Sequence, residues 1–245
     1  ALFLEGKSNV LTLEGELLKQ EVPELIAHWE RVKEQLINAS HTVEYSLRMG
    51  ILQPYDILVL PALLHDFSQH YPKINFEIVV GSTLELANAL NENRIDFALC
   101  SLPHEKHFAY EELFQEELCC ITSISNPLII NELADLEGNH LYRSKSDCPA
   151  RTKIESYLDN QVPSIHWESV SNISTIPYLI ERTGYCSLIP RSIIEQTHAR
   201  VKIVSLPLPD PHMSIGLLSK HPLMLSPSIT KNFVVELKMR LLSLL

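Results

Sequence analysis

From residue 45 onward, short apolar runs typical of strands alternate with segments patterned as helices. This alternation limits the possible folds more than any other feature of the chain. Strand–helix–strand repeats form parallel sheets with right-handed crossovers. The first half is therefore predicted to be an α/β unit. Its strands are expected at residues 45–51, 74–80 and 95–101, with a helix from Pro54 to about residue 70 and another at residues 84–93.

A second α/β unit is expected in the other half of the chain. Its strands are predicted near residues 140–142, 165–168 and 185–189, its helices near residues 149–158 and 173–182. Pro177 is tolerable in the second of these helices only near the first turn, because proline has no amide N–H. Strands at 117–123 and 213–219 are expected to cross between the units. The prediction is a clamshell with a cleft between two halves, completed by a short helix near 131–136, a strand at 201–206 and a last helix at 228–245.

The beginning of the chain has a different pattern. Residues 2–4 and 9–11 are β-like and flank a probable hairpin tip, after which Thr12 can cap a helix. Apolar residues then follow at spacings of 4, 3, 4, 3 and 4, which is a heptad seam and favours a dimerising helix over one packed on its own domain. Pro23 predicts a kink or a restart. The seam consists of Leu18, Val22, Leu25, Trp29, Val32 and Leu36.

Composition excludes several classes of protein. The chain carries 30 acidic and 20 basic residues, which give a net charge of −10, whereas a domain that binds nucleic acid should be basic. Five cysteines without a CxxC pair argue against a disulfide framework or a structural zinc site and favour buried free thiols. No apolar run is long enough for a membrane span and no signal peptide opens the chain, which favours a cytoplasmic protein. Because the chain begins at Ala1 in the middle of a pattern, we expect a basic recognition element upstream of it.

No enzyme motif is found. The sequence has no nucleophile elbow, no P-loop and no dinucleotide fingerprint. Two histidines lie in His104-Glu105-Lys106-His107, but their spacing is not that of a zinc-protease helix, and a surface loop is the favoured interpretation. We therefore expect no catalytic residues, no metal and no cofactor.

Three sets of motifs follow one another along the chain. The first is Leu11-Thr12-Leu13-Glu14-Gly15, after the hairpin. The second runs from Leu60-Pro61-Ala62-Leu63-Leu64 through Tyr71-Pro72 to Ile95-Asp96-Phe97-Ala98-Leu99. The third is Gly184-Tyr185-Cys186-Ser187-Leu188-Ile189-Pro190-Arg191. In this order they resemble the wing, linker helix and effector domain of LysR-type bacterial transcription regulators, over essentially the whole chain.

The resemblance implies a fold and a function. The fold is α/β, with two Rossmann-like subdomains as in type 2 periplasmic binding proteins, preceded by a winged-helix remnant and a long linker helix. The implied function is ligand-responsive regulation by a homodimer or homotetramer that binds DNA through the missing helix-turn-helix. Lys7 at the wing tip is the one candidate for a DNA contact. The expected division is 1–14 for the wing, 15–40 for the linker helix, 41–118 with 207–245 for subdomain I, and 119–206 for subdomain II.

A small-molecule effector is expected in the cleft, at loops that follow strands and precede helices. Free amides at helix starts bind polar groups there. Each such residue is also an ordinary helix cap. By the family resemblance, Thr83 falls where many members place a Ser or Thr against the inducer. Ser101 falls where some aromatic-acid sensors have an Arg, which this chain lacks. With the apolar first loop, this favours a neutral or mixed-polarity ligand. The candidates are Gln53, Ser82, Thr83, Ser101, Ser144, Ser146, Cys148, Pro149, Asn172, Ile173 and Ile189.

Two other functions remain open. Cys148 precedes a helix start and has basic neighbours in sequence, which lower a thiol pKa and allow a redox sensor. An inert thiol is the simpler interpretation, because Cys148 and Cys186 lack the spacing of a known sensor pair. A periplasmic-type solute-binding protein would share the fold, but the heptad helix, the wing and the missing signal peptide disfavour it.

Overall fold

The computed structural model describes residues 10–39, 45–103, 107–127, 130–145, 148–223 and 228–243. Residues 27, 30, 31 and 33–39 are described as backbone only. The hairpin tip, Lys7 and most of the wing expected at residues 1–14 lie outside these ranges, as does Ser146.

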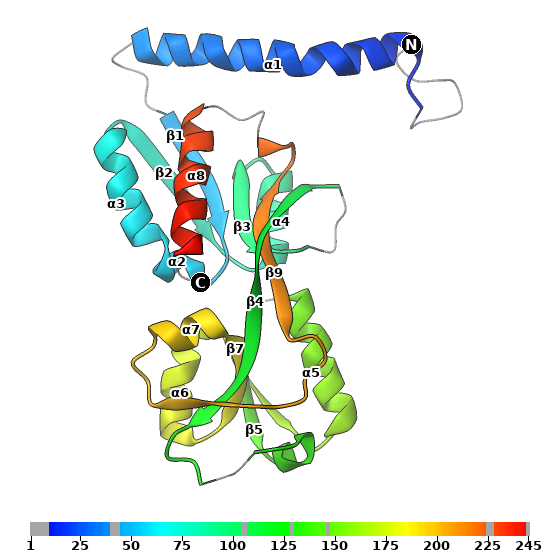
Figure 1. The fold of residues 1–245 in the computed structure, drawn as a ribbon, viewed down its shortest axis with the longest axis vertical. Helices are drawn as coiled ribbons and strands as arrows, with labels where there is room; N and C mark the ends of the chain where they lie inside the picture. Colours follow the sequence, from blue (N-terminus) through cyan, green and yellow to red (C-terminus); the bar gives the residue numbers. More distant parts are fainter. Residues whose placement is uncertain are drawn as a thin grey trace.

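Helix α1 (Leu13–Ala39) confirms that a long helix follows the hairpin region, where a linker helix at 15–40 was expected. Thr12 caps it, because its Oγ1 accepts the amide of Gly15 at 3.1 Å. The expected restart at Pro23 is wrong: the helix continues through this residue, since one lost amide donor does not end a helix of 27 residues (Figure 1). On the seam, Leu18, Leu25 and Trp29 are 42%, 64% and 57% exposed, Val22 and Val32 are half-buried, and the side chain of Leu36 lies outside the description.

The first half-sheet, which we call lobe I, confirms the predicted βαβαβ unit. Parallel strands run in the order β2-β1-β3. The expected single helix after Pro54 is instead two helices that meet at Val59. Pro61 cannot donate to the carbonyl of Ile57, four residues earlier, so the first helix ends and a new one begins. The elements are β1 (Tyr45–Ile51), α2 (Tyr55–Leu58), α3 (Leu60–His70), β2 (Ile74–Val80), α4 (Thr83–Asn91) and β3 (Phe97–Ser101).

The second half-sheet, lobe II, has parallel strands in the order β6-β5-β7. Pro177 lies in the first turn of its helix, as predicted, and Gly184 ends that helix with a φ of 73°. A short helix after Pro190 was not predicted, and the expected helix near 131–136 is a 3₁₀ turn. The elements are η1 (Leu133–Leu136), β5 (His140–Ser144), α5 (Pro149–Gln161), β6 (His166–Val170), η2 (Ile173–Thr175), α6 (Ile176–Thr183), β7 (Cys186–Pro190), α7 (Arg191–Gln196) and β8 (Val201–Val204).

Two antiparallel strands, β4 (Ala109–Ser123) and β9 (His212–Ser219), join the lobes (Figure 1). The first part of β4 pairs with β9, and β9 pairs with β3. The last part of β4 pairs with β7 and β8. The expected start of this strand at residue 117 is wrong by eight residues. Its first half carries several glutamates, which are poor strand formers, and their partners come from distant parts of the chain.

The core of lobe I is closed by the last helix, α8 (Ser228–Leu242). Phe233 from this helix packs against Phe67 at a ring distance of 5.1 Å, against Phe76 at 5.8 Å and against Phe97 at 6.3 Å. The same buried cluster continues across the crossing strands into lobe II, where it includes Leu141 and Ile154. No helix in the described ranges is long and apolar enough to cross a membrane.

Gly216 is required by the close approach of the crossing strands. A Cβ at this position would lie 2.3 Å from the backbone oxygen of Glu111 and 2.7 Å from the ring of Tyr110. We expect Gly216→Ala to lower the free energy of unfolding by about 1–3 kcal/mol, measured by urea denaturation.

Gly81→Ala is the matched control. Its Cβ would meet only side-chain atoms, the nearest being those of Glu85 at 3.1 Å and 3.2 Å. We expect a change smaller than about 1 kcal/mol. Equal stability of the two variants would contradict the prediction.

Candidate functional site

Thr83 and Ser101 come together at the edge of lobe I that faces lobe II. Thr83 is the first residue of α4 and Ser101 the last of β3. Their hydroxyl oxygens lie 2.6 Å apart, and each side chain is 2% exposed. Either hydroxyl can donate, so the pair can present a donor or an acceptor at the start of a helix.

Ser82 and Asn172 act as caps in the structure. The Ser82 side chain accepts the amide of Glu85, and the Glu85 carboxylate accepts the amide of Ser82 at 2.7 Å. The amide of Ser82, and then its hydroxyl, lower the pKa of the Glu85 carboxyl. Asn172 Oδ1 accepts the amide of Ser174 at 2.9 Å at the start of η2. Both oxygens therefore already stabilise a helix start.

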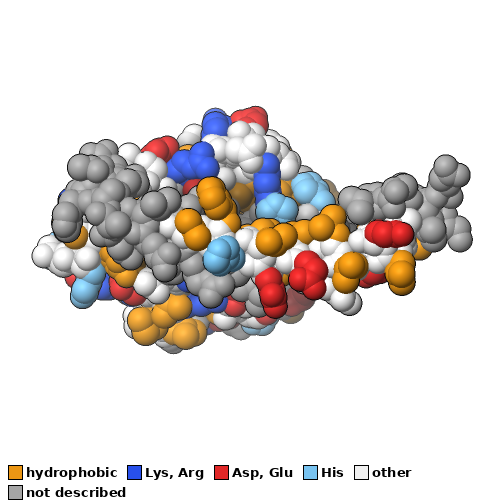
Figure 2. Space-filling model, turned by 90° about the horizontal axis from the view of Figure 1, so that it is seen from above, with side chains coloured by type: hydrophobic (Ala, Val, Ile, Leu, Met, Phe, Trp, Pro, Cys, Tyr) orange, Lys and Arg blue, Asp and Glu red, His pale blue; other side chains and the backbone are white. Residues whose placement is uncertain are grey.

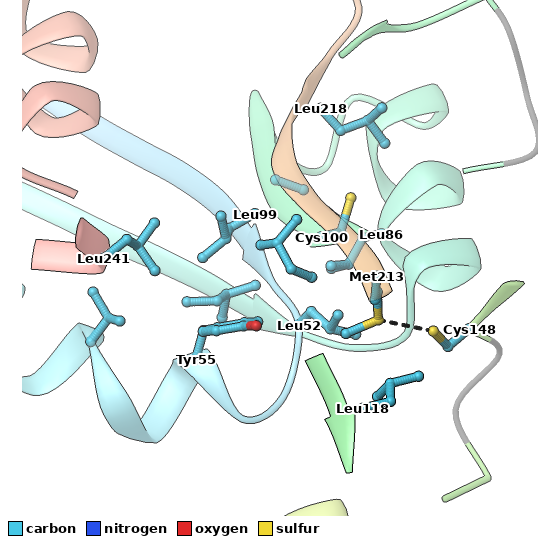
Figure 3. Close-up of a cluster of buried hydrophobic side chains, with 14 of the residues drawn as sticks. Leu52, Tyr55, Leu86, Leu99, Cys100, Leu118, Cys148, Met213, Leu218 and Leu241 are labelled. Carbon is cyan, nitrogen blue, oxygen red and sulfur yellow. Dashed lines mark hydrogen bonds between the residues drawn. The ribbon is translucent and has the colours of Figure 1, made fainter. Parts of the chain in front are cut away.

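Lobe II contributes Ser144, Cys148 and Pro149 to the opposite side. Ser144 is a buried residue at the end of β5, and Cys148 is the N-cap residue of α5, which Pro149 begins. The Cys148 thiol donates to the sulfur of Met213 at 3.1 Å, among Leu52, Leu118 and other apolar side chains (Figure 3).

Strand β9 relates the two sides to each other. Ser101 pairs with Ile215 in the strand register, and Met213 lies two residues earlier on β9, a separation of about 7 Å on the same face of the sheet. The Thr83–Ser101 pair of lobe I and Cys148 of lobe II therefore lie close to one stretch of β9. Gln53 is half-buried in the turn that follows β1.

Ile173 and Ile189 lie elsewhere. Their side chains belong to a second apolar cluster inside lobe II, together with Ile121, Ile176, Ile180 and Ile193. The structure therefore places them in the apolar packing of lobe II and not in the group formed by Thr83, Ser101 and Cys148.

Sequence reasoning missed a buried polar group beside this site. The Tyr55 hydroxyl donates to Glu116 Oε2 at 2.6 Å, and the backbone amide of Ser192 donates to Glu116 Oε1 at 3.1 Å. Tyr55 is 1% exposed and Glu116 is 3% exposed. Burial, and then the neighbouring carboxylate, raise the pKa of Tyr55 well above its ordinary value, so the phenol keeps its proton and donates.

Three basic residues near Cys148 in sequence, Arg143, Arg151 and Lys153, contact other groups. Buried Arg151 donates from Nε to Glu155 at 3.0 Å and from Nη2 to the carbonyl oxygen of Ser144 at 3.3 Å, which holds the loop after β5. Burial raises the pKa of Glu155, and Arg151 partly offsets this shift. The Arg143 guanidinium lies 5.6 Å from the centre of the Trp167 ring, and Lys153 pairs with Asp210 at 3.8 Å.

Of the two histidines at 104 and 107, the structure describes only His107. His104, Glu105 and Lys106 lie outside the described residues. His107 Nε2 is 3.4 Å from Asn91 Oδ1. Among the residues that the structure describes, no group of three or more His, Cys, Asp or Glu side chains could hold a metal ion.

Comparison with known proteins identifies the type of domain. The family model of the LysR substrate-binding domain matches residues 40–235. The HTH-type transcriptional regulator YtlI of Bacillus subtilis (strain 168) is 27% identical over 247 residues, which cover 98% of this chain and 79% of that protein. This relative is named as a regulator and not as an enzyme, in agreement with the expectation from the sequence.

Two solved structures share the fold. The effector-binding domain of a BenM variant superposes with a TM-score of 0.66 at 20% identity, covering 82% of this chain and 96% of that chain. The Synechocystis PCC6803 CcmR regulatory domain in complex with 2-PG gives a TM-score of 0.67 at 17% identity, covering 79% and 96%. The fold is the arrangement of type 2 periplasmic binding proteins, as predicted.

All five cysteines are buried in the structure. Burial raises the pKa of Cys100 to about 12 and that of Cys119 to about 11, and it also raises the pKa values of Cys120 and Cys186. A thiol with a pKa near 11 is ionised in about one molecule in ten thousand at pH 7. Cys148 is shielded by its contact with Met213.

We therefore expect the native thiols to react with a disulfide reagent at pH 7 at least about 100-fold more slowly than the same thiols in urea. The rate should rise with pH, because only the thiolate reacts. Absorbance of the thiolate released from the reagent measures the rates in native protein and in urea, and their dependence on pH. Rapid native reaction of one thiol that disappears in Cys148→Ser would contradict this prediction and support a redox role for Cys148.

Proposed function

Because the chain belongs to the LysR substrate-binding domain family, we propose that it is the effector-sensing region of a LysR-type transcription regulator. The observation that carries the proposal is the buried hydroxyl pair of Thr83 and Ser101, placed at a helix start and across Met213 from the Cys148 loop. In open α/β sheets, ligands bind at the carboxyl ends of strands, and both residues lie there.

The chemistry of these residues suggests the kind of effector. Hydroxyls and helix amides bind an oxygen of the ligand, and Leu52, Met213 and Cys148 offer apolar contact. The buried cation nearest in sequence to the Cys148 loop, Arg151, is held by Glu155 and Ser144. We propose a small molecule of neutral or mixed polarity, in place of a dicarboxylate. The CcmR regulatory domain, which shares the fold, was solved in complex with 2-PG, so a domain of this fold can bind a small molecule.

We further propose that different segments of the chain bind the effector, the DNA and the partner subunit. Subdomain I comprises residues 41–118 and 207–245, and subdomain II comprises residues 119–206. The effector binds between them and shifts the equilibrium between two arrangements, which requires different affinities for the two. A winged helix-turn-helix upstream, with Lys7 in its wing, binds DNA in the cytoplasm. A homodimer forms through α1, and dimers pair into a tetramer.

The alternatives receive less support. A redox sensor needs an accessible thiolate, whereas Cys148 is 3% exposed, and Arg143, Arg151 and Lys153 contact other groups. A solute-binding protein would share the two lobes. However, it would have no use for a 27-residue helix on which the seam residues Leu18, Leu25 and Trp29 are exposed.

Effector binding is tested by thermal shift with a library of metabolites. We expect Thr83→Val to weaken the binding of a hit about tenfold, because it removes one hydroxyl and leaves Ser101 without its partner. Ser82→Ala is the control: it removes a helix cap and lowers stability by about 1 kcal/mol but leaves the hydroxyl pair intact. Hits that bind both variants as tightly as the parent would refute the assignment of Thr83.

Dimerisation through α1 is tested by light scattering. We expect the parent chain to have the mass of a dimer or a larger assembly, and Leu25→Glu with Trp29→Glu to shift it toward smaller species, because these changes place charges in the seam. Leu13→Glu is the control, since Leu13 is 87% exposed and lies on the opposite side of the heptad. A monomeric parent would overturn the proposal for α1.

A further inference from the structure

Glu116 lies buried where β4 passes from one lobe to the other. Its two carboxylate oxygens accept hydrogen bonds from different lobes. The first donor is the hydroxyl of Tyr55 in α2 of lobe I, at 2.6 Å, and the second is the backbone amide of Ser192 in α7 of lobe II, at 3.1 Å. One side chain thus contacts both lobes beside the proposed effector site.

A buried carboxylate is costly unless hydrogen bonds replace its hydration. Glu116 is 3% exposed, so water does not readily replace a lost donor. Both donors reach the carboxylate only when α2 and α7 have the separation seen in the structure. The free energy of this group therefore depends on how the lobes sit relative to each other.

The two bonds differ in how firmly the donor is held. The start of α7 is tied to β4 a second time, because Arg191 pairs with Glu117 at 2.6 Å. On the paired strand, Met213 lies opposite Glu116 and contacts Cys148 at the start of α5, also in lobe II. At this level both crossing strands therefore have side-chain contacts with lobe II, in addition to the pairing of β9 with β3 of lobe I. On the lobe I side, Glu116 bonds to Tyr55, whose ring also packs edge-on against Phe114 of β4 at 5.9 Å.

We propose that Glu116 is a positioning residue that holds the lobes in the arrangement seen here, and that its hydrogen bond to Tyr55 breaks when the lobes move apart. The inference rests on the proposed function in one respect: we take the motion of the lobes to be the motion that the effector controls. An effector that favours the arrangement seen here then acts together with the Tyr55–Glu116 hydrogen bond beside its site. An effector that favours separated lobes acts against this bond.

The test measures the separation of the lobes without an effector. Spin labels are placed on Gln69→Cys in α3 and Ser156→Cys in α5, both exposed positions, while the native cysteines are buried. Pulsed electron paramagnetic resonance gives the distance distribution. We expect Tyr55→Phe to shift the ratio of a longer to the parent distance by about tenfold, since a hydrogen bond to a charged group is lost. Glu116→Gln, which can still form a weaker neutral bond, should shift it less.

Two matched controls remove a similar bond within one lobe. Tyr71→Phe loses the hydroxyl that accepts from Asn232 in lobe I, and Ser187→Ala loses the hydroxyl that donates to the carbonyl oxygen of Tyr142 in lobe II. Both should keep the parent distribution. An unchanged distribution in Tyr55→Phe, or an equal shift in the controls, would overturn the inference. If Glu116→Gln does not fold, Tyr55→Phe alone decides. Failure to find an effector would refute the proposed function and leave this measurement unaffected.

Discussion

The antiparallel pairing of β4 with β9 is the constraint on which the rest of the structure depends. Strand β4 takes part in both half-sheets, and β9 joins it to β3 of lobe I, so their hydrogen bonds fix the distance and angle between the lobes. Gly216 lets the strands approach, and Glu116 and Met213, opposite each other in the register, contact helices of the lobes. Figure 2 views the molecule from above Figure 1, the end at which α1 lies, and shows that apolar and charged side chains intermingle on this face. The candidate effector site lies beside these strands.

Much of the fold could be predicted from the sequence because apolar periodicity reports burial directly. The strands β1 and β2 have the bounds that their apolar runs predict, and β3 starts two residues later than expected. The prediction failed where tertiary partners override local preference. The glutamates in the first half of β4 pair with Lys238, Ser214 and Tyr55, which come from other parts of the chain. The break before α3 had a visible cause in Pro61, which the helical pattern obscured.

The candidate site was less predictable than the fold. The topological rule for α/β sheets selects the loops, and it pointed to Thr83 and Ser101, which lie together. It cannot separate a hydroxyl that caps a helix, such as Ser82, from one that faces a ligand. A signal for Glu116 did exist: it alternates with Phe114 and Leu118, so a period of two places a charge on the apolar face of a strand.

The order of the segments has a consequence for synthesis of the chain. Lobe I needs β9 and α8, which follow lobe II in the sequence, and Phe233 of α8 fills the centre of its aromatic core. Lobe II is built from one continuous stretch, so it can finish folding on the ribosome first, whereas the strands β1–β3 wait with an open apolar face until the last helix emerges. Exposure of this face to chaperones therefore lasts for most of translation.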